Sequence, residues 1–201
     1  MLEHRRYAGL APAEHVAALR AIIAASPMLM DALDRARALA LPDWWIVSGA
    51  IYNTVWNALT ARPPLTGIKD IDLFYFDPSD LSYEAEDAVI RRAEAHFDGL
   101  PLPVEVRNQA RVHLWYEAHF GQPVPPQRSS ADAIDHFASR THAAAARLTG
   151  EGTIEIYAPY GLDDLFSFRI TPNHLRNNRQ THEAKGARAL SVWPELTLVP
   201  W

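Results

Sequence analysis

At 201 residues the chain is long enough for one well-packed domain or two small lobes, and 48% hydrophobic with 21% charged residues is the composition of an ordinary folded protein. The absence of cysteine excludes disulfides and thiolate metal sites, the apolar runs are far too short to cross a bilayer, and Met1 to Arg6 lack the apolar segment of a secretion signal, so we expect a cytoplasmic protein. A formal net charge of -5 argues against an extended nucleic-acid surface and favours a small-molecule partner, while a nucleic-acid end held locally stays compatible with it.

The first third of the chain alternates helical and strand patterns. Apolar residues recur at helical spacing over residues 13–40, and Ser26-Pro27 interrupts them as a cap with proline in the first turn, so we predict two packed helices. A buried strand is predicted over residues 44–47. It ends at Ser48-Gly49, and a new helical pattern covers residues 51–59. The local order is strand, Ser-Gly turn, helix.

The middle of the chain predicts a crossover between two strands. Residues 62–67 form a proline-rich loop, and the alternating segment 67–77 that follows is a strand. A helix is predicted over residues 82–96, and a second strand over residues 104–106. Because a helix between two strands is the connection that a parallel pair needs, this order indicates an α/β core.

The last part of the chain begins with a linker-like loop over residues 121–130. We predict a helix over residues 131–148, in one or two pieces, because of its alanine run at 143–146. Two short strands follow, over residues 153–157 and 168–170. Thr171-Pro172-Asn173 opens a predicted polar helix that carries Arg176, Arg179, His182, Lys185 and Arg188.

These patterns predict a mixed β-sheet flanked by helices, between the α/β and α+β classes, with further α/β elements at the C-terminus. We divide the chain into two parts. Residues 1–120 hold the N-terminal helices and the core, and residues 121–201 form a helix and strand region that packs on it.

Three acidic residues lie on the two central strands. Successive side chains of a strand point to opposite faces, so Asp70 and Asp72 share one face while Ile71 and Leu73 line the other. A neighbouring strand can bring Glu105 to the same face. Carboxylates held together repel unless a positive charge lies between them, and hard divalent cations prefer oxygen ligands. We therefore predict Asp70, Asp72 and Glu105 as ligands of Mg²⁺, with Mn²⁺ as a substitute.

The Ser48-Gly49 turn is a candidate anion site. It places the N–H groups of a helix N-terminus towards a ligand, and glycine lets that ligand come close. A metal held by acids, next to a phosphate grip, suits phosphoryl or nucleotidyl transfer. The structural alternatives are a plain strand-to-helix connection at the turn and a solvent-facing edge strand or turn at Asp70 and Asp72.

Polar residues follow the second strand directly. Arg107 and Arg111 are predicted to contact phosphate, because a guanidinium binds phosphate oxygens in pairs, and the alternative is that they form salt bridges with the abundant acids. Asn108 and His113 either orient a substrate or cap the next helix.

Several strings resemble a known family. Ser48-Gly49 opening a helix, Asp70-Ile71-Asp72 and a later Glu105 are similar to the DNA polymerase β-type nucleotidyltransferase superfamily. The chain resembles more closely a bacterial nucleotidyltransferase-like family. Its matching strings are Gly49 with Asn53 and Val55-Trp56, Tyr75-Phe76-Asp77, Val106-Arg107-Asn108-Gln109-Ala110-Arg111-Val112-His113-Leu114-Trp115, Ala158-Pro159-Tyr160-Gly161-Leu162-Asp163-Asp164-Leu165 and Trp193-Pro194. They cover nearly the whole chain from about residue 15.

The resemblance implies a mixed sheet with the acids at its mouth, magnesium as cofactor and a nucleoside triphosphate as donor. Asp70 and Asp72 would be the paired metal ligands and Glu105 the third catalytic acid, with Ser48, Gly49, Asn53, Arg107, Asn108 and Arg111 binding the nucleotide. The chain departs from the superfamily in having Ala50 after the turn glycine, a longer spacing from Gly49 to Asp70, and Glu rather than Asp at the third acidic position.

The sequence predicts a magnesium-dependent transferase that moves a nucleoside monophosphate, AMP for preference, to a hydroxyl of an unknown small or macromolecular acceptor. A catalytically silent nucleotide-binding or interaction module with the same fold is the alternative, because of Ala50. A third reading is a sugar-nucleotide transferase that uses Asp-x-Asp. A phosphatase of the haloacid dehalogenase type is disfavoured, because Phe74 stands where those enzymes usually carry Thr or Val.

Overall fold

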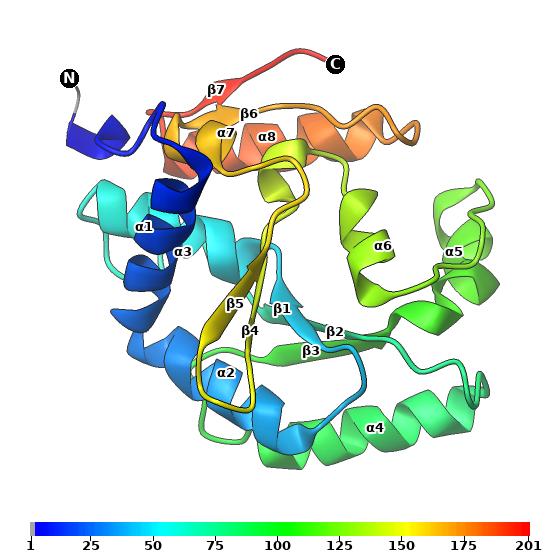
Figure 1. Cartoon of the computed structure of the whole chain (residues 1–201). Helices are drawn as coiled ribbons and strands as arrows, with labels where there is room; N and C mark the ends of the chain where they lie inside the picture. Colours follow the sequence, from blue (N-terminus) through cyan, green and yellow to red (C-terminus); the bar gives the residue numbers. More distant parts are fainter. Residues whose placement is uncertain (1–2) are drawn as a thin grey trace.

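The computed structural model describes residues 3–201, apart from the side chain of Phe120. A five-stranded mixed sheet has the strand order β3-β2-β1-β4-β5, and β6 and β7 form a separate pair (Figure 1). The helices are η1 (Glu3–Arg5), α1 (Pro12–Ala24), α2 (Pro27–Leu39), α3 (Gly49–Leu59), α4 (Tyr83–His96), η2 (Gln109–Arg111), α5 (Val112–Phe120), α6 (Ser130–Asp135), η3 (Arg140–His142), α7 (Asp163–Phe166) and α8 (Arg179–Val192). The strands are β1 (Trp45–Val47), β2 (Ile71–Tyr75), β3 (Val104–Asn108), β4 (Ala145–Leu148), β5 (Ile154–Tyr157), β6 (Arg169–Ile170) and β7 (Thr197–Leu198).

The N-terminal elements follow the sequence pattern closely. Ser26 caps α2, its Oγ accepting a hydrogen bond from the backbone N–H of Leu29, and Pro27 is the first helical residue. The predicted crossover is confirmed as well, since β2 and β3 are parallel and α4 joins them. Ser82 caps α4. The predicted class, a mixed sheet flanked by helices, is the observed one.

The two faces of the sheet differ as the alternation of β2 predicts. Ile71, Leu73 and Tyr75 are buried in the main core, which α1, α2, α3 and α4 help to form. Phe74 packs on the opposite face, in a smaller apolar cluster around Trp45. Asp72 lies between residues of the buried set in the chain, so its side chain belongs to the same face as Phe74. The acids are therefore on the less covered face of the sheet.

The predicted helix over residues 131–148 is wrong in its second half. Only α6 is an α-helix, and the alanine run leads into β4, which pairs with β1 on one side and β5 on the other. Ala144 and Ala146 are buried in the main core, whereas Ala143 and Ala145 are buried in the opposite cluster. This alternation is that of a strand covered on both faces, and the burial and sheet pairing outweigh the helix propensity of alanine.

The predicted C-terminal helix starts later than expected. Helix α8 begins at Arg179, so Arg176 precedes it. Asn173 does not open a helix, because its buried side chain donates hydrogen bonds to the backbone oxygen of Asp135 and to the Tyr160 hydroxyl. These contacts hold residues 171–178 against α6, and α8 then runs beside the β6 and β7 pair (Figure 1).

Within residues 3–201 no single helix is long and apolar enough to span a membrane. Helices α1 and α2 meet that criterion only when they are taken together, and they are bent by 94° where they meet.

We expect Gly67→Ala to destabilise the fold. Gly67 has a φ of 70°, and a Cβ there would lie 2.4 Å from the Trp193 ring, which is buried and cannot shift freely. Strain at positive φ and overpacking should together lower the free energy of unfolding by about 2–4 kcal/mol. Urea denaturation measures this loss. Gly99→Ala is the matched control, because Gly99 has a φ of 85° but nothing within 4 Å of the added Cβ. Equal losses in the two variants would refute the contact with Trp193 as the cause.

Candidate active site

A cavity of about 230 Å³ lies where the end of β1, the start of α3 and the acidic end of β2 meet. The register explains this meeting, because Asp72 pairs with Val47, the residue before Ser48. The cavity is lined by Ser48, Gly49, Tyr52, Asn53, Gly67, Lys69, Asp70, Asp72, Lys185 and Arg188. The structure thus brings together five of the residues singled out in the sequence, namely Ser48, Gly49, Asn53, Asp70 and Asp72.

The surroundings of Asp72 in this cavity disfavour the ionised form of its carboxyl group. Burial raises the pKa of this carboxyl from its ordinary value to about 6, and the charge of Asp70 acts in the same direction. The positive charge of Lys185 and a hydrogen bond with Ser48 partly oppose these effects. A carboxylate that is both desolvated and close to another one is stabilised by a further cation. The site is therefore electrostatically suited to a metal ion.

Ser48 has an unusual backbone. Its φ of 64° and ψ of -136° place it in a region that residues other than glycine rarely adopt. Its side chain does not cap α3, and it acts to lower the pKa values of the neighbouring Tyr52 and Asp72. The N–H groups of Ile51 and Tyr52 donate to the Ser48 oxygen, whereas those of Gly49 and Ala50 have no hydrogen-bond acceptor among residues 3–201. These two N–H groups are left for another acceptor, and the positive end of the helix dipole lies at the cavity of the acids. This supports the predicted anion-binding site at Ser48-Gly49.

Two cations from the far end of the chain complete the site. Lys185 and Arg188 lie on α8 and line the cavity opposite the acids. Burial lowers the pKa of Lys185, while the charge of Asp72 raises it. The sequence analysis placed both residues on a polar helix and gave them no role. The buried residues of α8 are His182, Gly186 and Ala189. Lys185 and Arg188 each precede one of these residues in the sequence, so they lie at the edge of the packed face of the helix, and this helical spacing was the one sign in the sequence that they contact the rest of the protein.

Glu105 is near the other acids but not part of the cavity lining. It is the register partner of Asp72 on β3, and its charge contributes to the raised pKa of Asp72. Its half-exposed side chain forms an ion pair with Arg107, with 3.7 Å between Nη2 and Oε2. Arg107 itself lines a second, larger cavity next to the first. Glu105 thus lies on the same face of the sheet as Asp72, and its carboxylate pairs with Arg107 of the same strand.

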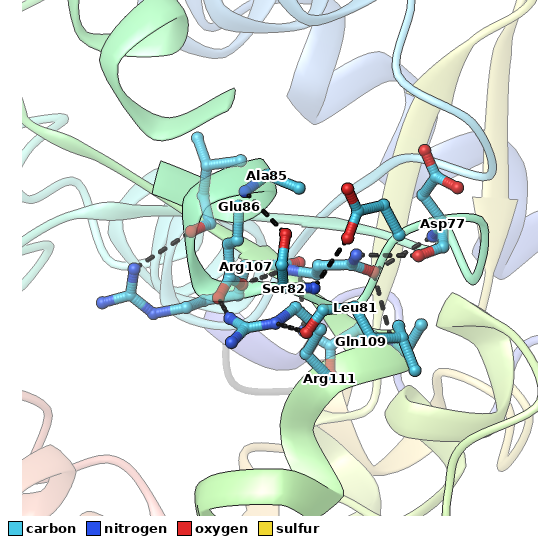
Figure 2. A network of polar contacts seen from close by, with 12 residues as sticks. Asp77, Leu81, Ser82, Ala85, Glu86, Arg107, Gln109 and Arg111 are labelled. Atoms are coloured by element: carbon cyan, nitrogen blue, oxygen red, sulfur yellow. Dashed lines mark hydrogen bonds and ion pairs between the residues drawn. The ribbon is translucent and has the colours of Figure 1, made fainter. Parts of the chain in front are cut away.

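Asn108 and Arg111, predicted to bind the nucleotide, both contact Glu86 of α4 in a buried polar network. Figure 2 shows Arg111 and Glu86 in this network. Arg111 forms an ion pair with Glu86 and donates a hydrogen bond from Nε to the Leu81 oxygen. Asn108 bonds to the backbone N–H and oxygen of Asp77 and caps η2. These are the contacts of the structural alternative, a salt bridge and a cap, and neither side chain lines the cavity of Asp72.

The loop before Asp70 is fixed by two asparagines of α3. Asn53 donates a hydrogen bond to the Gly67 oxygen, and Asn57 donates to the oxygens of Pro64 and Thr66. The Asn57 side chain also accepts a hydrogen bond from the Trp193 indole. Asn53 therefore contributes to the site by positioning the loop as well as by lining the cavity. Asn57 was not identified from the sequence.

The donor set fits magnesium to a limited extent. Among residues 3–201 there is no group of three or more His, Cys, Asp or Glu side chains that could hold a metal ion. Magnesium, however, is commonly bound by one or two carboxylates together with substrate phosphates and water. Asp70 and Asp72 supply that pair beside a cavity in which a phosphate tail can be held.

Comparison with known proteins agrees with this geometry. A family model described as nucleotidyltransferase matches residues 34–198. A solved structure, described as an NMR structure that reveals a CCA-adding enzyme head domain, is similar with a TM-score of 0.75 and 27% sequence identity, covering 91% of this chain and 95% of that one. No similar sequence was found among curated proteins. With a matching family model over most of its length and the corresponding fold, this chain belongs to the nucleotidyltransferase family.

Proposed function

We propose that this nucleotidyltransferase uses magnesium to move a nucleoside monophosphate, with AMP as the first candidate, from a nucleoside triphosphate to a hydroxyl of an acceptor. The observation that carries the proposal is one cavity that holds a helix N-terminus at Ser48-Gly49, the two carboxylates of Asp70 and Asp72, and three cations, of which Lys185 and Arg188 come from α8 and Lys69 precedes the acids. A triphosphate requires anion donors and cations, and its transfer requires carboxylates that hold a divalent ion.

Each group has a task in this proposal. The first turn of α3 binds the terminal phosphates, and Lys185 and Arg188 neutralise their charge and that of the departing pyrophosphate. Asp70 and Asp72 would hold the magnesium ion, and Glu105, the register partner of Asp72, would be the third acid beside it. When bound, the ion neutralises phosphate charge and lowers the pKa of the attacking hydroxyl. The asparagine contacts to the loop keep Asp70 in place.

A nucleotide-binding module without transfer is the second candidate. Its supporting observation is that Glu105 pairs with Arg107 and does not line the cavity. Both candidate functions require binding of a nucleoside triphosphate, but only the first includes transfer of the nucleoside monophosphate to an acceptor.

The test separates these steps. ATP with magnesium should raise the melting temperature, since a ligand at about 100 times its Kd adds about 2.7 kcal/mol to the free energy of unfolding. Chelation by EDTA should reduce the effect. ATP labelled at the α-phosphate should then transfer label to an acceptor and release pyrophosphate. A shift without transfer across a broad acceptor panel would support the silent module, and no shift with any nucleoside triphosphate would refute both.

We expect Lys185→Ala to weaken the hold on the triphosphate. Removing a partly buried cation that interacts with Asp72 should raise the KM for ATP by about 10- to 100-fold, because a hydrogen bond to a charged group contributes about 1.5–3 kcal/mol. Steady-state kinetics or nucleotide titration measures the change. Arg179→Ala is the control, since Arg179 lies on the same helix, is exposed and pairs with Glu183. Similar KM values for both variants would place the triphosphate elsewhere.

A further inference from the structure

A second cavity of about 370 Å³ adjoins the acidic site. The two cavities share Lys185. Phe74 and Arg107 also line the larger one, and they are register partners two residues further along β2 and β3 than Asp72 and Glu105. Two residues of strand correspond to about 7 Å. A molecule in the larger cavity can therefore reach the carboxylates.

The lining of this cavity combines aromatic rings with positive charge. Phe74 and Phe137 meet edge to face with ring centres 5.8 Å apart, and Trp115 and Tyr116 belong to the lining as well. The cations are Arg107, Arg176 and Lys185, and none of the lining residues is Asp or Glu. Such a cavity favours a ligand that is planar and carries negative charge.

Three of the lining residues carry buried polar atoms that lack a hydrogen-bond partner within the described part of the chain. These atoms are Oε1 of Gln127, Nε2 of His142 and Nη2 of Arg176. Gln127 is 6% exposed and His142 is 3% exposed. A buried polar group without a partner costs about 1–3 kcal/mol, so native proteins keep few of them. Their gathering around one cavity indicates a ligand that supplies the missing partners.

The strand order of the sheet indicates which of the two substrates, the nucleotide or the acceptor, occupies the larger cavity. In β3-β2-β1 the phosphate grip of Ser48-Gly49 follows β1, Asp72 lies on β2, and the larger cavity lies on the side of β3. In phosphoryl transfer the attacking and leaving oxygens are roughly in line, on opposite sides of the phosphorus. With pyrophosphate leaving on the β1 side, the acceptor hydroxyl comes from the β3 side.

We propose that this cavity binds the acceptor, and that the acceptor is a small planar anion with a free hydroxyl, of the hydroxylated aromatic acid class; this rests on the proposed transferase function. Arg176 binds the acid group and the Phe74 and Phe137 rings pack on the planar body. The hydroxyl oxygen forms a bond to the α-phosphorus, and the bond from that phosphorus to the bridging oxygen breaks. Pyrophosphate keeps the electron pair, and the hydroxyl proton passes to solvent. The product is a nucleotidyl ester of the acceptor.

The experiment uses three probes of matched size with the full chain. They are 4-hydroxybenzoate, its neutral counterpart 4-hydroxybenzamide, and the non-aromatic trans-4-hydroxycyclohexanecarboxylate. We expect calorimetric titration to show 4-hydroxybenzoate binding at least about tenfold more tightly than either of the others, because only it satisfies both the cations and the rings. Equal binding of the acid and the amide, or no binding of the acid, would overturn the proposal.

The variants locate the ligand. Arg176→Met should remove the preference for the acid over the amide and leave the ATP-induced thermal shift unchanged, whereas Arg128→Met, at an exposed residue paired with Asp132, should change neither. If Arg176→Met does not fold, Phe137→Leu takes its place, because it removes one of the two packed rings and should abolish the preference for the aromatic over the non-aromatic acid while leaving the ATP shift unchanged. Loss of the ATP shift in these variants would assign the cavity to the nucleobase and overturn the proposal, as would transfer to an oligonucleotide 3′ hydroxyl but not to the acid. Binding of the acid with the expected selectivity, but no effect of ATP, would uphold the ligand class and refute the transferase function instead.

Discussion

Asp72→Asn should reduce nucleotidyl transfer by roughly a thousandfold or more. Asp72 lines the cavity between the phosphate grip and Lys185, and it is the acid that pairs in register with Glu105. A metal ion contributes several kcal/mol of charge stabilisation in the transition state, and each 1.36 kcal/mol is a factor of ten in rate. The amide has almost the same shape but cannot supply the negative charge. Release of labelled pyrophosphate under saturating ATP and magnesium measures the loss.

The same change should not unfold the protein. The raised pKa of Asp72 means that its ionised form is disfavoured in the folded state, so the stability contributed by this group falls as pH rises from about 4 to about 6, and the uncharged amide avoids that cost. The melting temperature at pH 7 should therefore stay equal or rise. Asp34→Asn, at an exposed acid of α2 paired with Arg37, controls for the loss of one charge. Transfer that survives in Asp72→Asn would remove the acid from the mechanism.

Glu86→Ala should cause the largest loss of stability among the polar changes considered for this chain. Glu86 is 8% exposed, accepts a hydrogen bond from the Asn108 backbone N–H and forms an ion pair with Arg111 (Figure 2). Its removal leaves the Arg111 guanidinium buried without a counter-charge. Breaking a buried pair in this way costs about 3–5 kcal/mol. Urea unfolding should show a lower midpoint with an unchanged slope.

Two further variants test the explanation. Glu94→Ala lies on the exposed side of the same helix and should change the free energy of unfolding by less than about 0.5 kcal/mol. Replacing both partners, Glu86→Leu with Arg111→Met, should recover much of the loss, because an apolar pair leaves no uncompensated charge. A double variant as unstable as Glu86→Ala would mean that packing around α4, and not the buried charge, sets the cost.

The fold was predictable where local pattern and tertiary contacts agree. Ser26 with Pro27 and Ser82 mark helix starts by hydrogen bonds within one turn, so the sequence contains the whole signal. The alanine run was mispredicted for the opposite reason. Ala143 to Ala146 form good helix sequence by propensity, but they lead into β4, which begins at Ala145 and pairs with β5 and, more distantly in the sequence, with β1. That pairing joins residues about 100 positions apart, which no local window contains.

The parts of the candidate site that follow from short sequence patterns were predictable, and the parts that depend on distant elements were not. The Ser48-Gly49 turn and the Asp70, Asp72 pair each follow from a short pattern, and the register of β1 with β2 brings them together. Lys185 could not be connected with them, because a helix that passes over the cavity from the far end of the chain leaves no mark in its own sequence beyond a polar edge. For Arg111, both a phosphate contact and a salt bridge suited an arginine after a strand, and the place of Glu86 one helix earlier decides what it contacts.

The position of β4 inside the sheet has a consequence for how this chain can vary. Strand β4 lies between β1 and β5, and α8 supplies Lys185 to the cavity from still later in the chain. A fragment ending near residue 120 would expose the backbone edge of β1, a template for self-association, and would also lack a lysine that faces the acids. Changes in length are therefore expected in the surface loops. A fragment that ends near residue 120 is not expected to function as an independent domain.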